Sequence, residues 1–288
     1  MNFDGFIAID WSGDKNTYQK GIKVALLEKK SNSPKIVLPP NGLKYWSRSI
    51  LIDFLIKKSN KKKYLIGFDF AFAYPYDDIK SYFPNIKNSP TSAKKLWEFI
   101  EFYNKDEKNF YGGNTWHIEE LSELYNSPVK IGKNFQSRRR LTEIYAKKIC
   151  SPSTTFNCVG PGAVGTGSLA GMRVLGTLNK KFNIWPFNNS IEQKKSIIVE
   201  IFPTLYFRKF NCKPDKQLGY TIEIINSCLK HYNCASVSKD LKIYGPDQDE
   251  ADAIISVAAL KYFSDNIEYW EVPKIARKEG WIYGVKSN

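Results

Sequence analysis

Four aspartates of this chain are spaced so that they could together hold divalent cations. Asp10 ends the apolar segment FDGFIAID, and Asp69 ends a second one, YLIGFD. Asp249 and Asp252 open an apolar segment with helical spacing, where side chains three residues apart are neighbours, with about 5–6 Å between their Cβ atoms. Carboxylate oxygens are ligands that suit Mg²⁺ and Mn²⁺. The chemistry that such a set favours is phosphate-ester hydrolysis assisted by two cations.

The first two aspartates depend on strands for their position. Residues 3–10 and 64–69 are short, largely apolar and rich in β-forming side chains, as is typical of strands buried in the centre of a sheet. In an open α/β sheet, ligands bind beyond the carboxyl ends of the strands. We therefore expect Asp10 and Asp69 to contribute to one site.

The other two aspartates depend on a helix, which the sequence predicts from Pro246 to Phe263. Apolar residues recur along one face of this segment, at Ala251, Ile254, Ile255, Ala258 and Ala259. Asp252 lies beside this stripe. A carboxylate next to a buried face needs a partner, and a cation shared with the strand aspartates would provide one.

Asp249 has two interpretations. It could complete the set of metal ligands together with Asp252. Alternatively, Asp247, Asp249 and Glu250 could simply cap and charge the N-terminus of the helix, where carboxylates are favourable.

A glutamate in a third apolar segment is a further catalytic candidate. Glu200 is the only charged residue of SIIVEIFP, from Ser196 to Pro203, and a buried glutamate without a partner is costly. It could instead face water from an edge strand, because strand side chains alternate between faces. We favour the site, where Glu200 or Asp249 would hold a water molecule or complete the ligand set.

The composition favours a polyanionic partner. The 288 residues include 43 Lys and Arg against 29 Asp and Glu, which gives a net charge of +14. This charge would attract nucleic acid or an anionic membrane surface. AT-rich coding is an alternative explanation, and the many Asn, Ile, Lys and Tyr residues agree with it.

Basic residues in the middle of the chain are the expected nucleic-acid contacts. The guanidinium groups of Arg138, Arg139 and Arg140 can hold phosphates through paired hydrogen bonds. Lys147 and Arg173 lie in the stretch 144–191, which contains no Asp or Glu. The alternative for the three arginines is a surface cluster at a helix start.

Other classes of site are disfavoured. Five cysteines without a C-x-x-C pair argue against a disulfide framework or a zinc knuckle, and two histidines leave oxygen ligands to any metal. The turn GPGAVG at 160–165 matches G-x-G-x-x-G, but the acid expected about 20 residues later is missing, so no dinucleotide cofactor is expected. No leader pattern and no stretch of about 18 uninterrupted apolar residues occur, so we expect a soluble, cytoplasmic protein without a membrane partner.

The remaining elements complete an α/β arrangement. Residues 21–29 and 36–38 predict two antiparallel strands, and residues 51–56 predict a helix. Residues 71–150 are interpreted as a helical insertion in a single domain that spans residues 1–288. The helix candidates within this insertion are residues 93–103, 118–125 and 138–149.

Five segments, in this order, resemble a bacterial and archaeal family known as domain of unknown function family 429. They are IAIDWSG at 7–13, IGFDFAFAYP at 66–75, VEIFP at 199–203, DEADA at 249–253 and EGWIYGV at 279–285. The resemblance implies a ribonuclease H-like mixed sheet flanked by helices, with an acidic metal site. Carried over by position, the family's acids correspond to Asp10, Asp69, Glu200 and Asp252, with Asp249 a less certain match.

The leading hypothesis is therefore a metal-dependent nuclease. Asp10 would bridge two Mg²⁺ or Mn²⁺ ions, with Asp69 and Asp252 as further ligands. One alternative is a nucleic-acid-binding protein of the same fold that has lost catalysis. Another is a phosphotransferase of the actin-like superfamily, which the absence of a second DWSG-like segment argues against. The sequence leaves DNA, RNA or junction substrates and the oligomeric state open.

Overall fold

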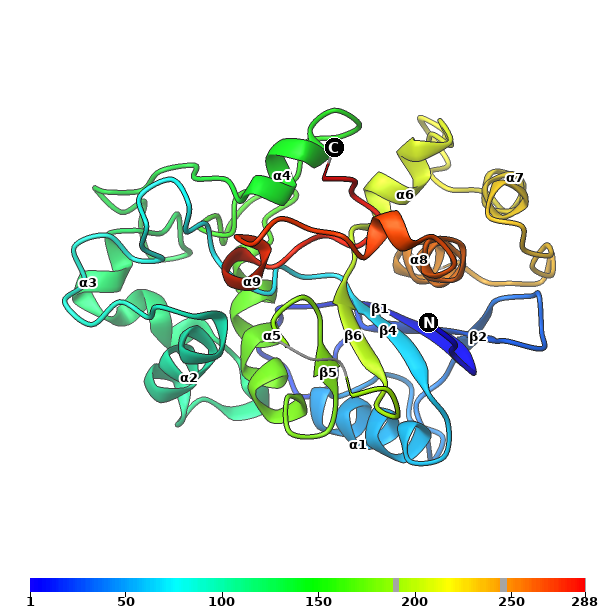
Figure 1. The fold of residues 1–288 in the computed structure, drawn as a ribbon, viewed down its shortest axis with the longest axis horizontal. Helices are drawn as coiled ribbons and strands as arrows, with labels where there is room; N and C mark the ends of the chain where they lie inside the picture. The colour runs from blue at the N-terminus through cyan, green and yellow to red at the C-terminus, as the bar shows by residue number, and fades with distance from the viewer. Residues whose placement is uncertain (189–191, 244–247, 288) are drawn as a thin grey trace.

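A mixed sheet lies at the centre of the protein, whose computed structural model describes residues 1–188, 192–243 and 248–287 (Figure 1). Within these residues the sheet has six strands in the order β3-β2-β1-β4-β6-β5. They are β1 (Gly5–Asp10), β2 (Lys23–Glu28), β3 (Lys35–Val37), β4 (Tyr64–Phe68), β5 (Asn183–Ile184) and β6 (Ile197–Glu200). The first three are antiparallel neighbours, whereas β4, β5 and β6 run parallel to β1.

The central strands are buried as their apolar sequences predict. Every residue of β1, β4 and β6 is buried, while the short edge strand β3 is half-exposed. Strands buried on both faces read as continuous apolar runs. The five strands expected from the sequence are thus confirmed, and the two-residue strand β5 is an addition.

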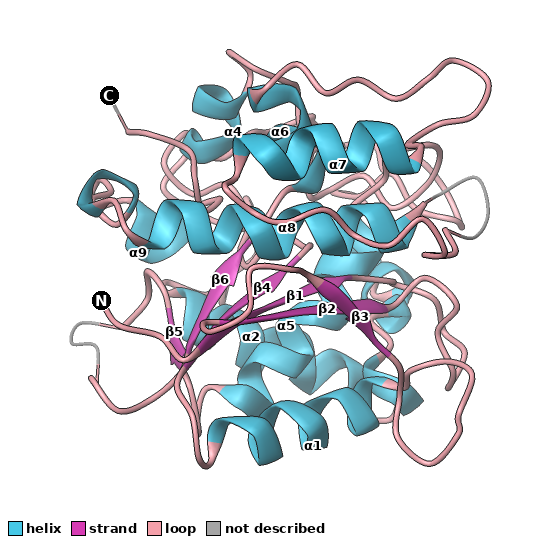
Figure 2. Ribbon diagram, turned by 90° about the vertical axis from the view of Figure 1, so that its right-hand side faces the viewer, coloured by secondary structure: helices cyan, strands magenta, loops and turns pink. Residues whose placement is uncertain are grey.

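Helices cover both faces of the sheet (Figure 2). On one face lies α8 (Asp249–Ser264), which contacts β1, β2 and β4 and is covered in turn by α6 (Pro203–Lys209) and α7 (Ile222–His231). Because α8 lies between these layers, it is buried almost all round, beyond the single stripe expected from its sequence. The helix itself is confirmed, although Pro246 and Asp247 lie outside the described residues.

The opposite face is covered by α1 (Arg48–Ser59) and α5 (Gly165–Leu178). Alternate residues of β1 belong to the two hydrophobic cores on either side of the sheet. Ile7 and Ile9 pack on the α1 and α5 side, and Phe6 and Ala8 pack on the α8 side. Helix α5 was not expected, because four glycines in its 14 residues lower helix propensity. Tertiary packing requires a glycine at position 171, since a Cβ atom on Gly171 would lie 2.4 Å from the Phe70 ring.

The expected insertion contains less helix than its sequence indicates. Helix α2 (Ala93–Asn104) confirms the first candidate and packs on α5. The second candidate, residues 118–125, contains only the short helix α3 (Glu119–Ser122). The third, residues 138–149, contains only α4 (Leu141–Ala146). Two 3₁₀ turns lie between α2 and α3, η1 (Lys108–Phe110) and η2 (Gly113–His117). The expectation that residues 1–288 form a single domain stays a prediction.

The C-terminal part adds two short elements, η3 (Ile267–Tyr269) and α9 (Ala276–Glu279). In the part of the chain that the structure describes, no helix combines the length and hydropathy needed to cross a membrane.

Candidate active site

Adjacent parallel strands place Asp10 and Asp69 side by side. Ile9 pairs with Phe68 in the register of β1 and β4, and the Asp69 amide donates to the Ile9 carbonyl at 3.1 Å. The next residue of each segment is an aspartate, and both side chains point to the face that α8 covers, by alternation from Ala8 and Gly67. The two carboxyl groups are close enough to share a hydrogen bond.

The first turn of α8 adds the other two aspartates. Asp249 is the first residue of the helix and Asp252 follows three residues later, both half-buried. The Asp249 carboxylate also approaches the loop after β1, since a Cβ atom on Gly21 would lie 3.5 Å from its Oδ2. The structure therefore brings together four aspartates from three elements, which we call the aspartate cluster.

Burial and mutual repulsion govern the charge of this cluster. The pKa of Asp10 lies well above its usual range, first because the group is buried and then because Asp252, Asp69 and Asp249 are near. Burial, followed by the neighbouring charge of Glu200, raises the pKa of Asp69 to about 7. Burial also raises the pKa of Asp252, with Asp69 and Asp249 as further causes. A bound cation would relieve this repulsion.

The donor chemistry of the cluster suits Mg²⁺ or Mn²⁺, because it offers only carboxylate oxygens. Among the residues that the structure describes, however, no three His, Cys, Asp or Glu side chains are arranged so that they could hold one metal ion as they stand. The aspartate cluster thus has the composition and the crowded negative charge of a cation site, without a preformed coordination shell within the described residues.

The loop after β1 is held in place by an arginine that sequence reasoning missed. Arg48 is 1% exposed and donates to the carbonyls of Ser12 at 2.6 Å, Asp14 at 2.8 Å and Asn109 at 2.6 Å. Its position directly after the N-cap of α1, Ser47, gave no signal in the sequence. Arg48 fixes the backbone that follows Asp10.

Helix α5 supports the loops that follow both strands. The Trp11 indole donates to the Gly167 carbonyl at 2.9 Å. After β4, the Ala71 amide donates to the Ser168 hydroxyl at 3.1 Å. The glycine-rich segment before α5 is therefore part of the surroundings of the site, with Gly167 directly beneath the loop after β1.

Glu200 is occupied elsewhere, which corrects its expected role. Its carboxylate accepts two hydrogen bonds from Arg140, at 2.6 and 2.8 Å, and one from the Phe72 amide at 3.0 Å. Glu200 pairs in register with Phe68, one residue before Asp69, and so belongs to the opposite face of the sheet. It lies near Asp69, but in this arrangement its oxygens are not available as metal ligands.

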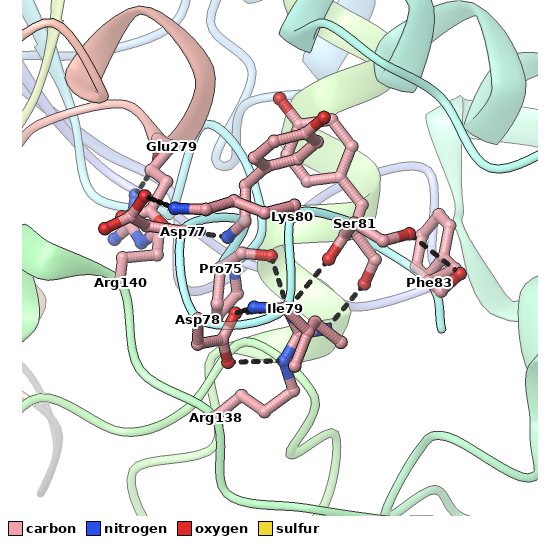
Figure 3. Close-up of polar contacts among 12 residues, drawn as sticks. Pro75, Asp77, Asp78, Ile79, Lys80, Ser81, Phe83, Arg138, Arg140 and Glu279 are labelled. Atoms are coloured by element: carbon pink, nitrogen blue, oxygen red, sulfur yellow. Dashed lines mark hydrogen bonds and ion pairs between the residues drawn. The ribbon is translucent and has the colours of Figure 1, made fainter. Parts of the chain in front are cut away.

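Three of the expected phosphate contacts are also corrected, because they bind the protein itself. Arg138 is 8% exposed and binds both oxygens of Asp78, as Figure 3 shows, at 2.6 and 2.8 Å. Arg140 joins Glu200 and Glu143. Arg173 is 5% exposed and pairs with Glu101 at 2.6 Å. These guanidinium groups hold the insertion and the sheet together.

The two remaining basic residues have different surroundings. Arg139 is half-buried and forms no ion pair with any residue in the described part of the chain, where its Nη1 atom is buried without a hydrogen-bond partner. Arg139 therefore differs from Arg138 and Arg140, which both lie in ion pairs, and its side chain lines the cavity described below. Lys147 is exposed just after α4, and its expected contact with nucleic acid stays a prediction.

A cavity of about 1080 Å³ opens beside Asp69. Its walls come from the loop after β1, the segment 151–153, the glycine-rich segment 158–167 and the start of α6. Arg139 is also part of the wall. The space therefore connects Asp69 of the aspartate cluster with Arg139, the arginine of the triplet that has no ion pair within residues 1–188, 192–243 and 248–287.

Comparisons of the chain with protein-family models, with curated proteins and with solved structures found no match.

Proposed function

We propose that this protein is a metal-dependent nuclease that hydrolyses phosphodiester bonds at the aspartate cluster. The observation that carries the proposal is the crowding of Asp10, Asp69, Asp249 and Asp252, in which burial and neighbouring carboxylates raise the pKa values of Asp10, Asp69 and Asp252. So much buried negative charge is unfavourable unless a cation or protons neutralise it.

The sheet topology supports a ribonuclease H-like fold within this proposal. Three antiparallel strands, a helix, and a fourth strand parallel to the first follow one another in the chain, and the last long helix lies across the sheet. The order and spacing of the acids agree with the resemblance to domain of unknown function family 429. We propose both the ribonuclease H-like fold and the membership of this family.

The chain's own residues have distinct tasks in this mechanism. Asp10 and Asp69 would hold Mg²⁺ or Mn²⁺ from the sheet, and Asp249 and Asp252 from α8. Two bound cations would activate the attacking water and stabilise the leaving oxygen. Arg48 and α5 fix the loops that carry the strand aspartates. Arg140 neutralises Glu200 and so limits the negative charge around Asp69.

The test compares wild type with Asp10→Asn on single-stranded, double-stranded and junction DNA and RNA, with Mg²⁺, Mn²⁺ or a chelator. We expect cleavage that requires the metal and that falls by at least about 100-fold in Asp10→Asn, as for the loss of a group that stabilises transition-state charge. Arg277→Gln, on the exposed surface of α9, is the matched control and should retain full activity.

A nucleic-acid-binding protein without catalysis is the competing function. Binding that survives Asp10→Asn, together with no cleavage of any substrate under any metal condition, would establish it in place of the nuclease.

A further inference from the structure

The wall of the cavity beside Asp69 includes the cation of Arg139, which has no ion-pair partner in the part of the chain that the structure describes. The neighbouring Arg138 and Arg140 are both buried in ion pairs, whereas the Nη1 atom of Arg139 is buried without a hydrogen-bond partner within the described residues. An unsatisfied buried donor costs about 1–3 kcal/mol, and more when the group is charged. The rest of the half-buried Arg139 side chain lines the cavity, so an anion held there would supply the charge partner of this guanidinium group.

Among the described residues, neither acid of the cavity wall, Asp14 or Asp69, forms an ion pair with Arg139. Asp14 is exposed and accepts hydrogen bonds from the backbone and the side chain of Asn16, at 3.0 and 2.9 Å. Asp69 belongs to the aspartate cluster. A second cation, Lys15, is exposed at the wall. The cavity wall therefore combines the cations Arg139 and Lys15 with the acid Asp69, as a phosphate chain held both by protein cations and by a metal ion at the aspartate cluster would require.

The wall also offers aromatic surface. Phe202 and Tyr111 line the cavity, and both are half-buried. Stacking of a base on an aromatic side chain contributes about 1–3 kcal/mol and accepts any base, because each base has a π-face. Hydroxyl groups of Ser151, Ser153 and Thr204 lie along the same wall.

The volume of this space and the cost of unstacking paired bases favour one strand over two. Ligand cavities are typically about 300–1,000 Å³, and at about 1080 Å³ this one suits a short, single flexible chain. Bases inside a double helix are stacked and paired, so they reach a recessed aromatic wall only after unstacking, which costs a few kcal/mol. A single strand presents its bases without that cost.

We infer that the cavity binds a single-stranded nucleic-acid segment, with Arg139 on a phosphate and Phe202 against a base, so that the strand passes Asp69. This inference rests on the proposed function, because it assigns the substrate class of the same site.

The test measures binding of labelled single-stranded DNA, single-stranded RNA and the matching duplexes to the full-length protein in chelator, where cleavage is suppressed. We expect single strands to bind at least about tenfold more tightly than duplexes, because a flipped base costs a few kcal/mol. Arg139→Gln should weaken single-strand binding about tenfold, as for a lost charged hydrogen bond, and Arg139→Lys should restore part of it. The two single-stranded ligands distinguish DNA from RNA.

Arg277→Gln is again the matched control, since it removes the same charge from an exposed position away from the cavity. Equal affinity for single strands and duplexes would overturn the inference, and so would a loss in Arg139→Gln no greater than in Arg277→Gln. Melting curves of both variants show that each is folded. Single-strand binding that depends on Arg139, without any cleavage, would reject the nuclease and support the cavity assignment. Metal-dependent cleavage without a preference for single strands would support the nuclease and reject the cavity assignment.

Discussion

Individual carboxylates of this protein differ in what neutralises them. Glu200 is 2% exposed and has its own arginine at 2.6 Å, whereas Asp10 is 7% exposed and faces other aspartates. Removal of one partner from a buried ion pair leaves an uncompensated charge, but removal of one charge from a repelling group relieves strain. The two acids should therefore respond to substitution in opposite ways.

Glu200→Gln should destabilise the protein by about 1–3 kcal/mol, because it removes the charge that accepts two buried hydrogen bonds from Arg140 and leaves Glu143 as the ion-pair partner of this arginine. Asp10→Asn should leave the metal-free protein as stable as wild type or more stable. Urea denaturation in chelator measures both free energies of unfolding. Equal losses in the two variants would contradict the separate roles of these acids.

The response to pH follows from Asp69. Its pKa rises from the ordinary 3.8 to about 7 in the folded protein, so the folded state keeps a proton that the unfolded chain releases. The free energy of unfolding of the metal-free protein should therefore fall as the pH increases from about 4 to about 7. Denaturation curves across this range should show that decline in wild type and a flatter profile in Asp69→Asn.

Cation binding should reverse the repulsion. At a Mg²⁺ concentration 100 times the Kd, the gain in stability is about 2.7 kcal/mol. The melting temperature of wild type should rise more than that of Asp10→Asn, by about 2–4 °C for each kcal/mol. Thermal denaturation with and without Mg²⁺ measures the difference, and equal shifts in both proteins would count against a cation at the cluster.

At the scale of elements, the site depends on the contact between the loop after β1 and helix α5. A Cβ atom on Gly13 would lie 2.5 Å from the Gly167 amide nitrogen, a distance at which the backbone must move. On Gly167 itself, a Cβ atom would meet Trp11 at 3.5 Å, an ordinary contact. Gly13 and Gly167 face each other. Only Gly13 must be a glycine, because a Cβ atom there would collide with the backbone of α5.

Gly13→Ala should therefore reduce both cleavage and stability, because it displaces the loop that follows Asp10. Gly167→Ala should be neutral or should stabilise the protein by up to about 1 kcal/mol, since alanine is the better helix former. Activity assays and urea denaturation of the pair test this. A neutral Gly13→Ala would show that the loop is free to move away from α5.

For the whole molecule, the relevant quantity is a net charge of +14 on a chain in which the buried Arg138, Arg140 and Arg173 are already held in ion pairs. Exposed lysines must then supply most of the attraction to a polyanion. Each neutralised phosphate contributes about −0.7 to −0.9 to the slope of log affinity against log salt concentration.

Binding of single-stranded oligonucleotides should consequently weaken steeply between low and physiological salt, as anisotropy titrations at several salt concentrations will show. Arg139→Gln should lower the magnitude of the slope by about 1, which corresponds to the loss of one phosphate contact. A salt-independent affinity would reject nucleic acid as the partner of the basic surface.

Local patterns of the sequence determined the central strands, the helix of residues 249–264 and the positions of the four aspartates. The apolar strand runs and the helical spacing of apolar residues are properties of neighbouring residues, so no tertiary information is needed to read them. Helix α5 was not predicted because its glycines disfavour a helix locally, and it is stabilised by tertiary packing against α2, Phe70 and the loop after β1.

Only the tertiary structure decided which partner each charged side chain binds. Glu200 and Arg140 are 60 residues apart in sequence, and their pairing depends on how the residue before α4 is placed at the end of β6. The same placement turns Arg138 and Arg140 inward and leaves Arg139 facing the cavity. A charge is visible in the sequence, but its partner is set by long-range packing, because electrostatic interactions depend on distance and burial rather than on residue type.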